Sequence, residues 1–171
     1  IWVNKIIEQK VATETTAIDL KIDSQDRPHI LYSDPVHKLV RHAVKMGGSW
    51  SIENIDEKKS VGFVAMAIDG KDTPHVAYTD IEENALYYSK QVNGHWDPRM
   101  IEENESEVTG WFPSLAIDSS DNVHMAYQGT DHQSLKYATL GKNPAEIKSL
   151  ISKEGGHFEF SSSQGPGKID I

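Results

Sequence analysis

One short pattern occurs three times in the chain and limits the folds it can adopt more than any other feature. It spans residues 22–32, 68–78 and 117–127, with the sequences IDSQDRPHILY, IDGKDTPHVAY and IDSSDNVHMAY. The Asp near its start recurs at Asp23, Asp69 and Asp118, and a series of tryptophans recurs at a similar spacing at Trp2, Trp50 and Trp96. Repetition at a fixed period is typical of proteins built from stacked structural units.

Each unit predicts four short strands, because apolar runs of strand length are separated by turn residues. The pair Asn93-Gly94 indicates a tight hairpin, since both residues tolerate a positive φ. In the third unit, residues 143–154 stand where the fourth strand belongs and are interpreted as a degenerate strand. The strands expected in the second unit cover residues 63–69, 74–80, 85–91 and 96–102.

A four-stranded antiparallel unit repeated at this period predicts an all-β fold, specifically a β-propeller in which each unit is a blade. Such rings usually have about 4 to 8 blades. We therefore expect a partial ring, completed by the rest of a longer chain or by another copy. The expected division is an outer strand at 1–9, three complete blades at 16–56, 62–103 and 111–152, and the inner strand of a further blade at 167–171.

The repeated Ala-Ile-Asp, the Pro-His-x-Ala-Tyr that follows it, and the later Gly-x-Trp resemble the repeats of bacterial secreted β-propellers of the sialidase-like, Asp-box-related kind. The resemblance implies a secreted or extracellular protein, in a group that includes lectins, adhesion modules and polysaccharide lyases. The strict Asp-box sequence is absent. Sialidases use an arginine triad, whereas this chain has only Arg27, Arg41 and Arg99, so we assign no catalytic residue.

Composition excludes several classes of function. The chain has 17 basic and 26 acidic residues and a net charge of −9, which argues against nucleic acid or an anionic membrane as a partner. No apolar run approaches the roughly 18 residues of a membrane span. The absence of cysteine excludes disulfides and cysteine-based metal sites.

The paired Asp residues of each repeated turn have two interpretations. One is a Ca²⁺ site, and the other is a turn whose Asp accepts hydrogen bonds from its own backbone. Two carboxylates fall short of the six to eight oxygens that Ca²⁺ takes, so we favour the turn and predict no metal or cofactor. The repeated His29, His75 and His124 are interpreted as packed side chains with a fixed hydrogen bond, not as metal ligands.

Residues that break the repeat are the better candidates for a binding site, because the scaffold is what repeats. Loops between strands two and three share one face of each blade with the loops that join blades. This face combines most of the acidic excess with an aromatic pair, which suits a sugar or a cation; a solvated acidic rim is the alternative. The candidate ligand-binding residues are Asp34, His37, Asp80, Glu82, Trp111, Phe112, Asp131 and His132.

Together these features favour a non-enzymatic propeller module that binds a carbohydrate or a protein surface on its loop-rich face. The alternative is the propeller domain of a polysaccharide-active enzyme, either a sialidase-like hydrolase or a lyase, with part of its site outside this segment. A purely structural interaction domain is the third hypothesis.

Overall fold

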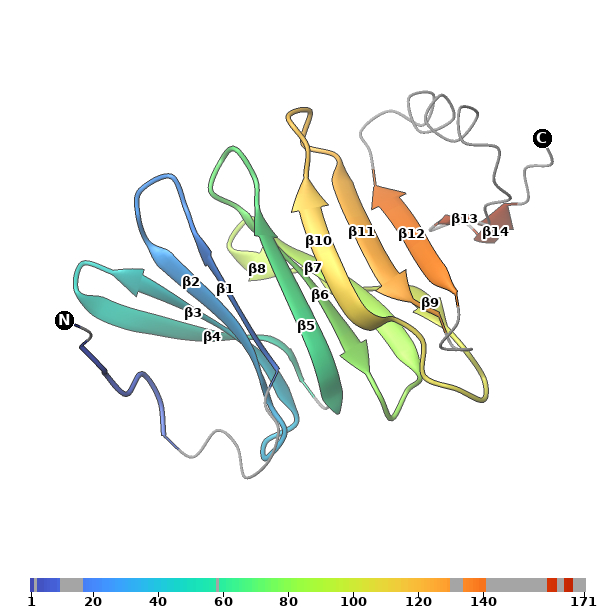
Figure 1. Ribbon diagram of the computed structural model, residues 1–171, viewed down its shortest axis with the longest axis horizontal. Coiled ribbons are helices and arrows are strands. Elements are labelled where there is room, and N and C mark those ends of the chain that lie inside the picture. Colours follow the sequence, from blue (N-terminus) through green and yellow to red (C-terminus); the bar gives the residue numbers. More distant parts are fainter. Residues whose placement is uncertain are drawn as a thin grey trace.

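The computed structural model describes residues 1, 3–9, 17–57, 59–129, 134–140, 160–162 and 165–167, and every regular element in these ranges is a β-strand. The prediction of an all-β fold is therefore confirmed for the residues that the structure describes. Three antiparallel sheets lie side by side, and the second sheet is in the middle (Figure 1). Within these ranges, no helix has the length and apolar character needed to cross a membrane.

The strands follow one another along each sheet. The first sheet contains β1 (Ile18–Ile22), β2 (Pro28–Asp34), β3 (Leu39–Met46) and β4 (Ser49–Glu57). The second contains β5 (Val61–Ile68), β6 (Pro74–Asp80), β7 (Ala85–Val92), β8 (His95–Trp96) and β9 (Arg99–Glu103). The third contains β10 (Trp111–Ile117), β11 (Val123–Gln128) and β12 (Leu135–Leu140). A separate hairpin pairs β13 (Phe160–Ser162) with β14 (Gly165–Gly167).

The fourth strand expected at 96–102 is divided into β8 and β9, which both pair with β7. Pro98 lies at the break, where its missing N–H cannot contribute to the ladder. Asp97 N still donates to Lys90 O across 3.1 Å, so the chain stays beside β7 through the break.

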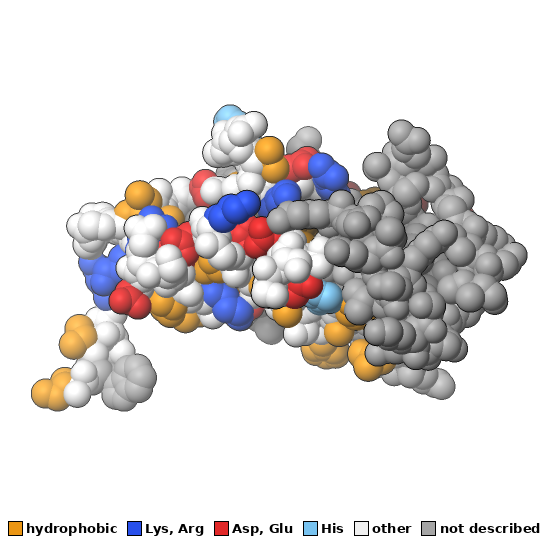
Figure 2. Space-filling model, turned by 90° about the horizontal axis from the view of Figure 1, so that it is seen from above, with side chains coloured by type: hydrophobic (Ala, Val, Ile, Leu, Met, Phe, Trp, Pro, Cys, Tyr) orange, Lys and Arg blue, Asp and Glu red, His pale blue; other side chains and the backbone are white. Residues whose placement is uncertain are grey.

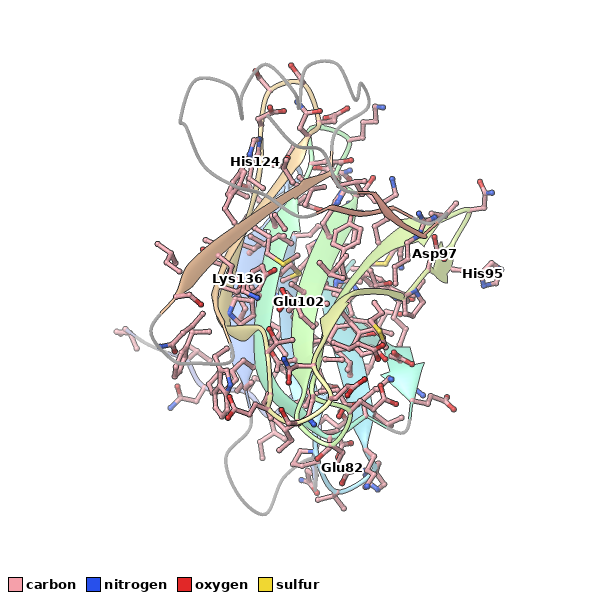
Figure 3. All side chains as sticks on the ribbon, turned by 90° about the vertical axis from the view of Figure 1, so that its right-hand side faces the viewer. Glu82, His95, Asp97, Glu102, His124 and Lys136 are labelled. Carbon is pink, nitrogen blue, oxygen red and sulfur yellow. The ribbon has the colours of Figure 1, made fainter. Side chains whose placement is uncertain are left out.

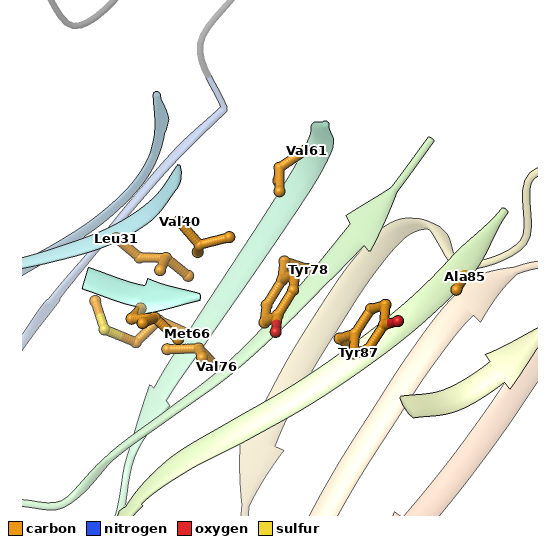
Figure 4. Packing of buried hydrophobic residues seen from close by; sticks show 9 residues of the cluster. Leu31, Val40, Val61, Met66, Val76, Tyr78, Ala85 and Tyr87 are labelled. Carbon is orange, nitrogen blue, oxygen red and sulfur yellow. The ribbon is translucent and has the colours of Figure 1, made fainter. Parts of the chain in front are cut away.

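Two apolar clusters fill the spaces between the sheets, so both faces of the second sheet are buried. This follows from the alternation of side chains along a strand, which sends successive residues to opposite faces. The cluster between the first and second sheets, drawn in Figure 4, contains Leu31, Val40, Ile55, Val61, Met66, Val76, Tyr78, Ala85 and Tyr87. The cluster between the second and third contains Ala65, Ala67, Ala77, Leu86, Tyr88, Leu115, Val123, Met125 and Tyr127.

A tyrosine on the second strand of each sheet bonds to an acid that precedes that sheet in the chain. Tyr78 OH donates to Asp56 Oδ2 of β4 across 2.5 Å, and Tyr127 OH donates to Glu102 Oε2 of β9 across 2.6 Å. Burial raises the pKa of Tyr78, and the hydrogen bond to Asp56 raises it further, so the phenol stays protonated and donates. These bonds tie the outer strand of one sheet to the next sheet.

The N-terminal segment differs from its prediction. Residues 3–9 form no strand, although an outer strand was expected at 1–9. The outer strand of a sheet pairs with the third strand of the same sheet. Among the described residues, the third strand of the first sheet, β3, already pairs with β4, and no other third strand lies beside residues 3–9. Glu8 nevertheless takes the same role as Asp56 and Glu102, since Tyr32 OH donates to Glu8 Oε2 across 2.5 Å.

The expected strand at 143–154 and residues 168–171 lie outside the described ranges, whereas Gly167 ends β14. The domain division stays a prediction.

The first Asp of each repeated turn closes that turn. Asp69 Oδ1 accepts hydrogen bonds from the backbone N–H groups of Lys71 (2.9 Å) and Thr73 (2.8 Å), and Asp72 adopts a left-handed φ of 62°. The turns that begin at Asp23 and Asp118 repeat these bonds. The carboxylates are therefore engaged in turn geometry. In the part of the chain that the structure describes, no group of three or more His, Asp or Glu side chains could hold a metal ion.

The repeated histidine connects the turn to the third strand. His75 Nε2 lies 3.4 Å from Asp69 Oδ2, and its Nδ1 lies 2.7 Å from Tyr88 OH on β7. His124 bridges Asp118 and Tyr137 in the same way, at 3.2 Å and 2.6 Å. The fixed hydrogen bond expected for the repeated histidine is therefore present, and it lies within a single sheet.

Replacing Asp69 tests the contribution of one turn. Asp69→Ala removes two backbone hydrogen bonds and leaves His75 Nε2 without its carboxylate partner, so we expect the free energy of unfolding to fall by about 2 kcal/mol. Asp69→Asn retains the acceptor at Oδ1 and should lose less. Urea denaturation of both variants measures the difference, and equal losses would contradict a role for the Oδ1 acceptor.

The same carboxylates predict acid sensitivity. Burial would raise the pKa of Asp69, but hydrogen bonds from Thr73, Lys71 and His75 outweigh it and hold that pKa below its usual value. The pKa values of Asp23 and Asp118 are lowered as well. Because the folded pKa lies below the unfolded value of about 3.9, these groups stabilise the fold above that pH, and the stabilisation is lost as the pH falls below about 4.

Thermal unfolding between neutral pH and strong acid measures this loss. Asp69→Asn removes one of the three titrating groups, so its melting temperature should fall less on acidification than that of the unaltered chain. An equal fall in both proteins would show that this turn makes no contribution to the acid sensitivity.

Candidate functional site

We call the two ends of the sheets the hairpin end and the loop end. The hairpin end carries the repeated Asp turns, and the loop end carries the β2–β3 and β6–β7 loops and the connections between sheets (Figure 1). Figure 3 shows Glu82 at the loop end and His124 toward the opposite end. Figure 2 looks onto the hairpin end, where basic and acidic side chains are interspersed. The predicted site residues that the structure describes, which are all but Asp131 and His132, lie at the loop end.

Asp34 and His37 form a local pair in the β2–β3 loop. The buried Asp34 accepts a hydrogen bond at Oδ1 from His37 N (3.1 Å), and its Oδ2 lies 2.8 Å from His37 Nδ1. A carboxylate only accepts, so Nδ1 carries the proton and Nε2 of the neutral ring is an acceptor. The His37 side chain is exposed, which leaves that acceptor available to a ligand.

Glu82 joins the loops of two sheets. Lys38 Nζ lies 2.8 Å from both carboxylate oxygens of Glu82, and both side chains are exposed. An exposed pair of this kind contributes about 0–1 kcal/mol to stability. Its effect is to place Glu82 beside the loop that holds His37.

A buried lysine lies between the first and second sheets at the loop end. Lys59 Nζ donates to Glu83 Oε2 (2.5 Å), lies 3.8 Å from Asp80 Oδ2, and sits 4.1 Å above the centre of the Tyr87 ring. Tyr87 OH also donates to Glu83 Oε2. Hydrogen bonds from Lys59 and Tyr87 lower the pKa of Glu83, so this carboxylate is the main partner of the lysine.

Asp80 is less well paired with Lys59 than Glu83 is, since Lys59 Nζ lies 3.8 Å from its Oδ2. Its Oδ1 accepts hydrogen bonds from the backbone N–H groups of Glu82 (2.9 Å) and Glu83 (3.2 Å). Its buried Oδ2 has no hydrogen-bond partner among the described residues. Burial raises the pKa of Asp80, and these backbone hydrogen bonds only partly oppose the effect.

Replacing Asp80 with asparagine tests whether the charge of this buried carboxyl reduces stability. Because the folded pKa of Asp80 lies above its unfolded value, its ionisation costs folding free energy once the pH rises above about 4. Asp80→Asn keeps the Oδ1 acceptor and removes the charge, so we expect stability at pH 7 to be unchanged or to increase by up to about 1 kcal/mol.

The matched control is Asp34→Asn, because Asp34 faces His37 Nδ1 and Arg41 Nε (3.7 Å) and needs its charge. Urea denaturation at pH 7 should show a clear loss for this variant. A larger loss for Asp80→Asn than for Asp34→Asn would contradict the assignment.

Three aromatic rings meet where β5 and β10 begin. The centre of the Phe63 ring lies 5.1 Å from that of Trp111 and 4.4 Å from that of Phe112. Trp111 Nε1 donates to Val108 O across 2.7 Å, which holds the indole in the scaffold. Phe112, at 63% relative exposure, offers the more accessible ring.

Phe112 is presented by an irregularity in the sheet. The β10–β11 pairing shifts register between Trp111 and Ser114, and Phe112 adopts a φ of 50°. A β-bulge redirects a side chain, and a left-handed conformation at a residue other than glycine costs on the order of 1–3 kcal/mol. Such a conformation persists only where the surrounding structure imposes it.

Gly110 brings this aromatic group close to the carboxylates. Its φ is 75°, and a Cβ there would lie 2.6 Å from Leu86 Cβ, so no other residue fits without a shift. Its carbonyl accepts a hydrogen bond from Thr79 Oγ1. Thr79 pairs with Phe63 and directly precedes Asp80, so the rings and the buried carboxyl lie at adjoining strand ends.

The structure therefore places six of the eight predicted residues at one end, in neighbouring groups, whereas Asp131 and His132 lie outside the described residues. Sequence reasoning missed Phe63, Lys59 and Tyr87. A usable signal existed for Phe63, because it stands five residues before the Ile of the repeat, as Phe112 does. Lys59 and Tyr87 could not be found this way, since their meeting depends on contact between sheets.

No family model matches the chain, and no curated protein matches it. Among solved structures, a fucose lectin from Kordia zhangzhouensis in complex with methyl-fucoside is similar, with 11% sequence identity and a TM-score of 0.48. The match covers 75% of this chain and 94% of the lectin chain. A likeness at this level supports no inference about function, which has to be argued from the side chains.

Proposed function

We propose that the chain is a stretch of β-propeller in which each of the three sheets is one blade. The contacts of β5 with β1 and with β10, the first strands of their sheets, support this arrangement. The repeated bond from a second-strand tyrosine to the acid of a preceding outer strand supports it as well. The sialidase-like character of the repeats and a secreted or extracellular location belong to the same proposal.

We further propose that this module is non-enzymatic and binds a carbohydrate at the loop end. The observation that carries the proposal is the exposed ring of Phe112, held at a strained φ beside Phe63. The apolar C–H face of a sugar packs against such a ring, and acceptors near it would receive the sugar hydroxyls. The proposed acceptors are His37 Nε2 and Glu82, and the buried Asp80 holds the loop that carries Glu82. Trp111, whose ring centre lies 6.2 Å from that of Phe112, belongs to the same proposed site, and Asp131 and His132 stay candidates from the sequence.

A polysaccharide-active enzyme is the second candidate, and the Asp34–His37 pair favours it. A buried carboxylate that orients an exposed imidazole is an arrangement used in general base catalysis. The partner groups of such a site would come from outside the described residues. Release of new chain ends from a polysaccharide, lost on His37→Gln, would support this candidate over simple binding.

Truncation of Phe112 tests the carbohydrate site. On a glycan array, we expect the protein to retain at least one glycan and Phe112→Ala to weaken that binding at least tenfold, because the stacking surface is lost. Alanine keeps the Cβ at this left-handed position, and the ring that it removes is largely exposed, so the variant should lose little stability. Thermal unfolding of the variant checks this.

Met46→Ala is the matched control, since Met46 is an exposed apolar residue at the end of β3 that lies opposite the loop end. Its glycan binding should equal that of the unaltered protein. Absence of binding to any glycan, or equal loss in both variants, would remove the carbohydrate proposal and leave a protein surface as the ligand.

A further inference from the structure

The three sheets stack in the same orientation, so each interface joins the same two kinds of face. We call the side that carries Tyr32, Tyr78 or Tyr127 the front face, and the side that carries the repeated histidine the back face. The back face of the first sheet packs on the front face of the second, and the back face of the second packs on the front face of the third. Two faces remain outside these interfaces: the front of the first sheet and the back of the third.

The front face of the first sheet exposes apolar side chains whose equivalents are buried. Leu20, Met66 and Leu115 stand two residues before the repeated Ile-Asp in their units. Met66 is 1% exposed and Leu115 is 9% exposed, each within an interface, whereas Leu20 is 51% exposed. Ile18 and Ile22, on the same face of β1, are exposed as well.

The back face of the third sheet shows the complementary difference. Tyr137 is 45% exposed, although Tyr88 at the same position of the second sheet is 3% exposed. Ala116 is exposed, although Ala67 at its position is buried against the third sheet. The side chains that receive a neighbouring sheet in the interior are therefore also present here, and no other sheet among the described residues packs on them as the third sheet packs on the second.

The N-terminal segment fills only one end of the open front face. Glu8 bonds to Tyr32 and Arg41, in the place that Asp56 and Glu102 take in the interior interfaces. The side chains of β1 stay uncovered. The open face thus already accepts the acid of a preceding unit and lacks the apolar sheet that accompanies that acid elsewhere.

We propose that these two faces join copies of this chain head to tail, the front of the first sheet in one copy against the back of the third sheet in another. The occupant is a second copy because the chain carries both halves of an interface that it already forms twice. Burial of the exposed Leu, Ile and Tyr side chains drives the association. A head-to-tail contact closes into a ring or continues as a filament, depending on its rotation. This inference does not depend on carbohydrate binding.

Two charge variants test the proposal by sedimentation velocity on the full chain over a wide range of concentration. The unaltered protein should associate further as its concentration rises. Leu20→Asp blocks the front face and Ala116→Glu blocks the back face, so each variant alone should be monomeric. Both positions are exposed, so folding should be retained, and thermal unfolding checks it. Met100→Asp, an exposed change on β9, should associate like the unaltered protein.

Mixing the two variants gives the decisive result. Leu20→Asp keeps an intact back face and Ala116→Glu keeps an intact front face, so an equimolar mixture should form a 1:1 dimer and nothing larger. An unaltered chain that stays monomeric at every concentration overturns the proposal and leaves these faces to other parts of a longer chain. A mixture that stays monomeric overturns it too, as does a Leu20→Asp variant that still associates.

Discussion

A hydrogen-bonded carboxylate at the end of each first strand is the constraint on which the three sheets depend. Asp69 accepts two backbone hydrogen bonds within its turn and meets His75, which reaches Tyr88 on the third strand. One side chain therefore fixes the turn, the second strand and the third strand together. A carboxylate without these partners would be costly to bury, so the turn forms only in the geometry that satisfies it. This unit is repeated in each sheet and forms the scaffold, whereas the residues at the loop end differ from sheet to sheet.

Much of the fold could be predicted because it is encoded locally. The strand expected at 74–80 is β6, and that expected at 85–91 is β7 with one further residue. Alternation and turn residues suffice for such hairpins. The same reasoning failed at residues 3–9, where strand formation requires a partner that is not local. The break at Pro98 was within reach of sequence reasoning, because proline removes a ladder donor.

The candidate site likewise contains local contacts, which could be predicted, and contacts between sheets, which could not. Asp34 and His37 are three residues apart, so a loop brings them together without help from the rest of the fold. Lys59 meets Glu83 and Tyr87 only because a connection between sheets passes over the third strand of the next one. The left-handed Phe112 was beyond prediction, since an aromatic residue is a poor candidate for that conformation. The residues that break the repeat indicated the loop end as the candidate site. The contacts between sheets, which decide the chemistry of that site, could not be predicted.

The scaffold itself changes at one position, where His42 of β3 replaces the tyrosine found on β7 and β12. His29 Nε2 lies 3.1 Å from Asp23 Oδ2, His29 Nδ1 lies 2.9 Å from His42 Nε2, and His42 Nδ1 lies 2.9 Å from Glu53 Oε1. The pKa values of both acids are lowered, so both are ionised and only accept. Burial lowers the pKa of His29, and the hydrogen bond to Asp23 only partly opposes the effect. Glu53 also accepts a hydrogen bond from Gln91 Nε2 across 2.6 Å. The first sheet is thereby joined to the second through the chain Asp23–His29–His42–Glu53–Gln91, where the corresponding position at the interface of the second sheet with the third is the tyrosine Tyr88.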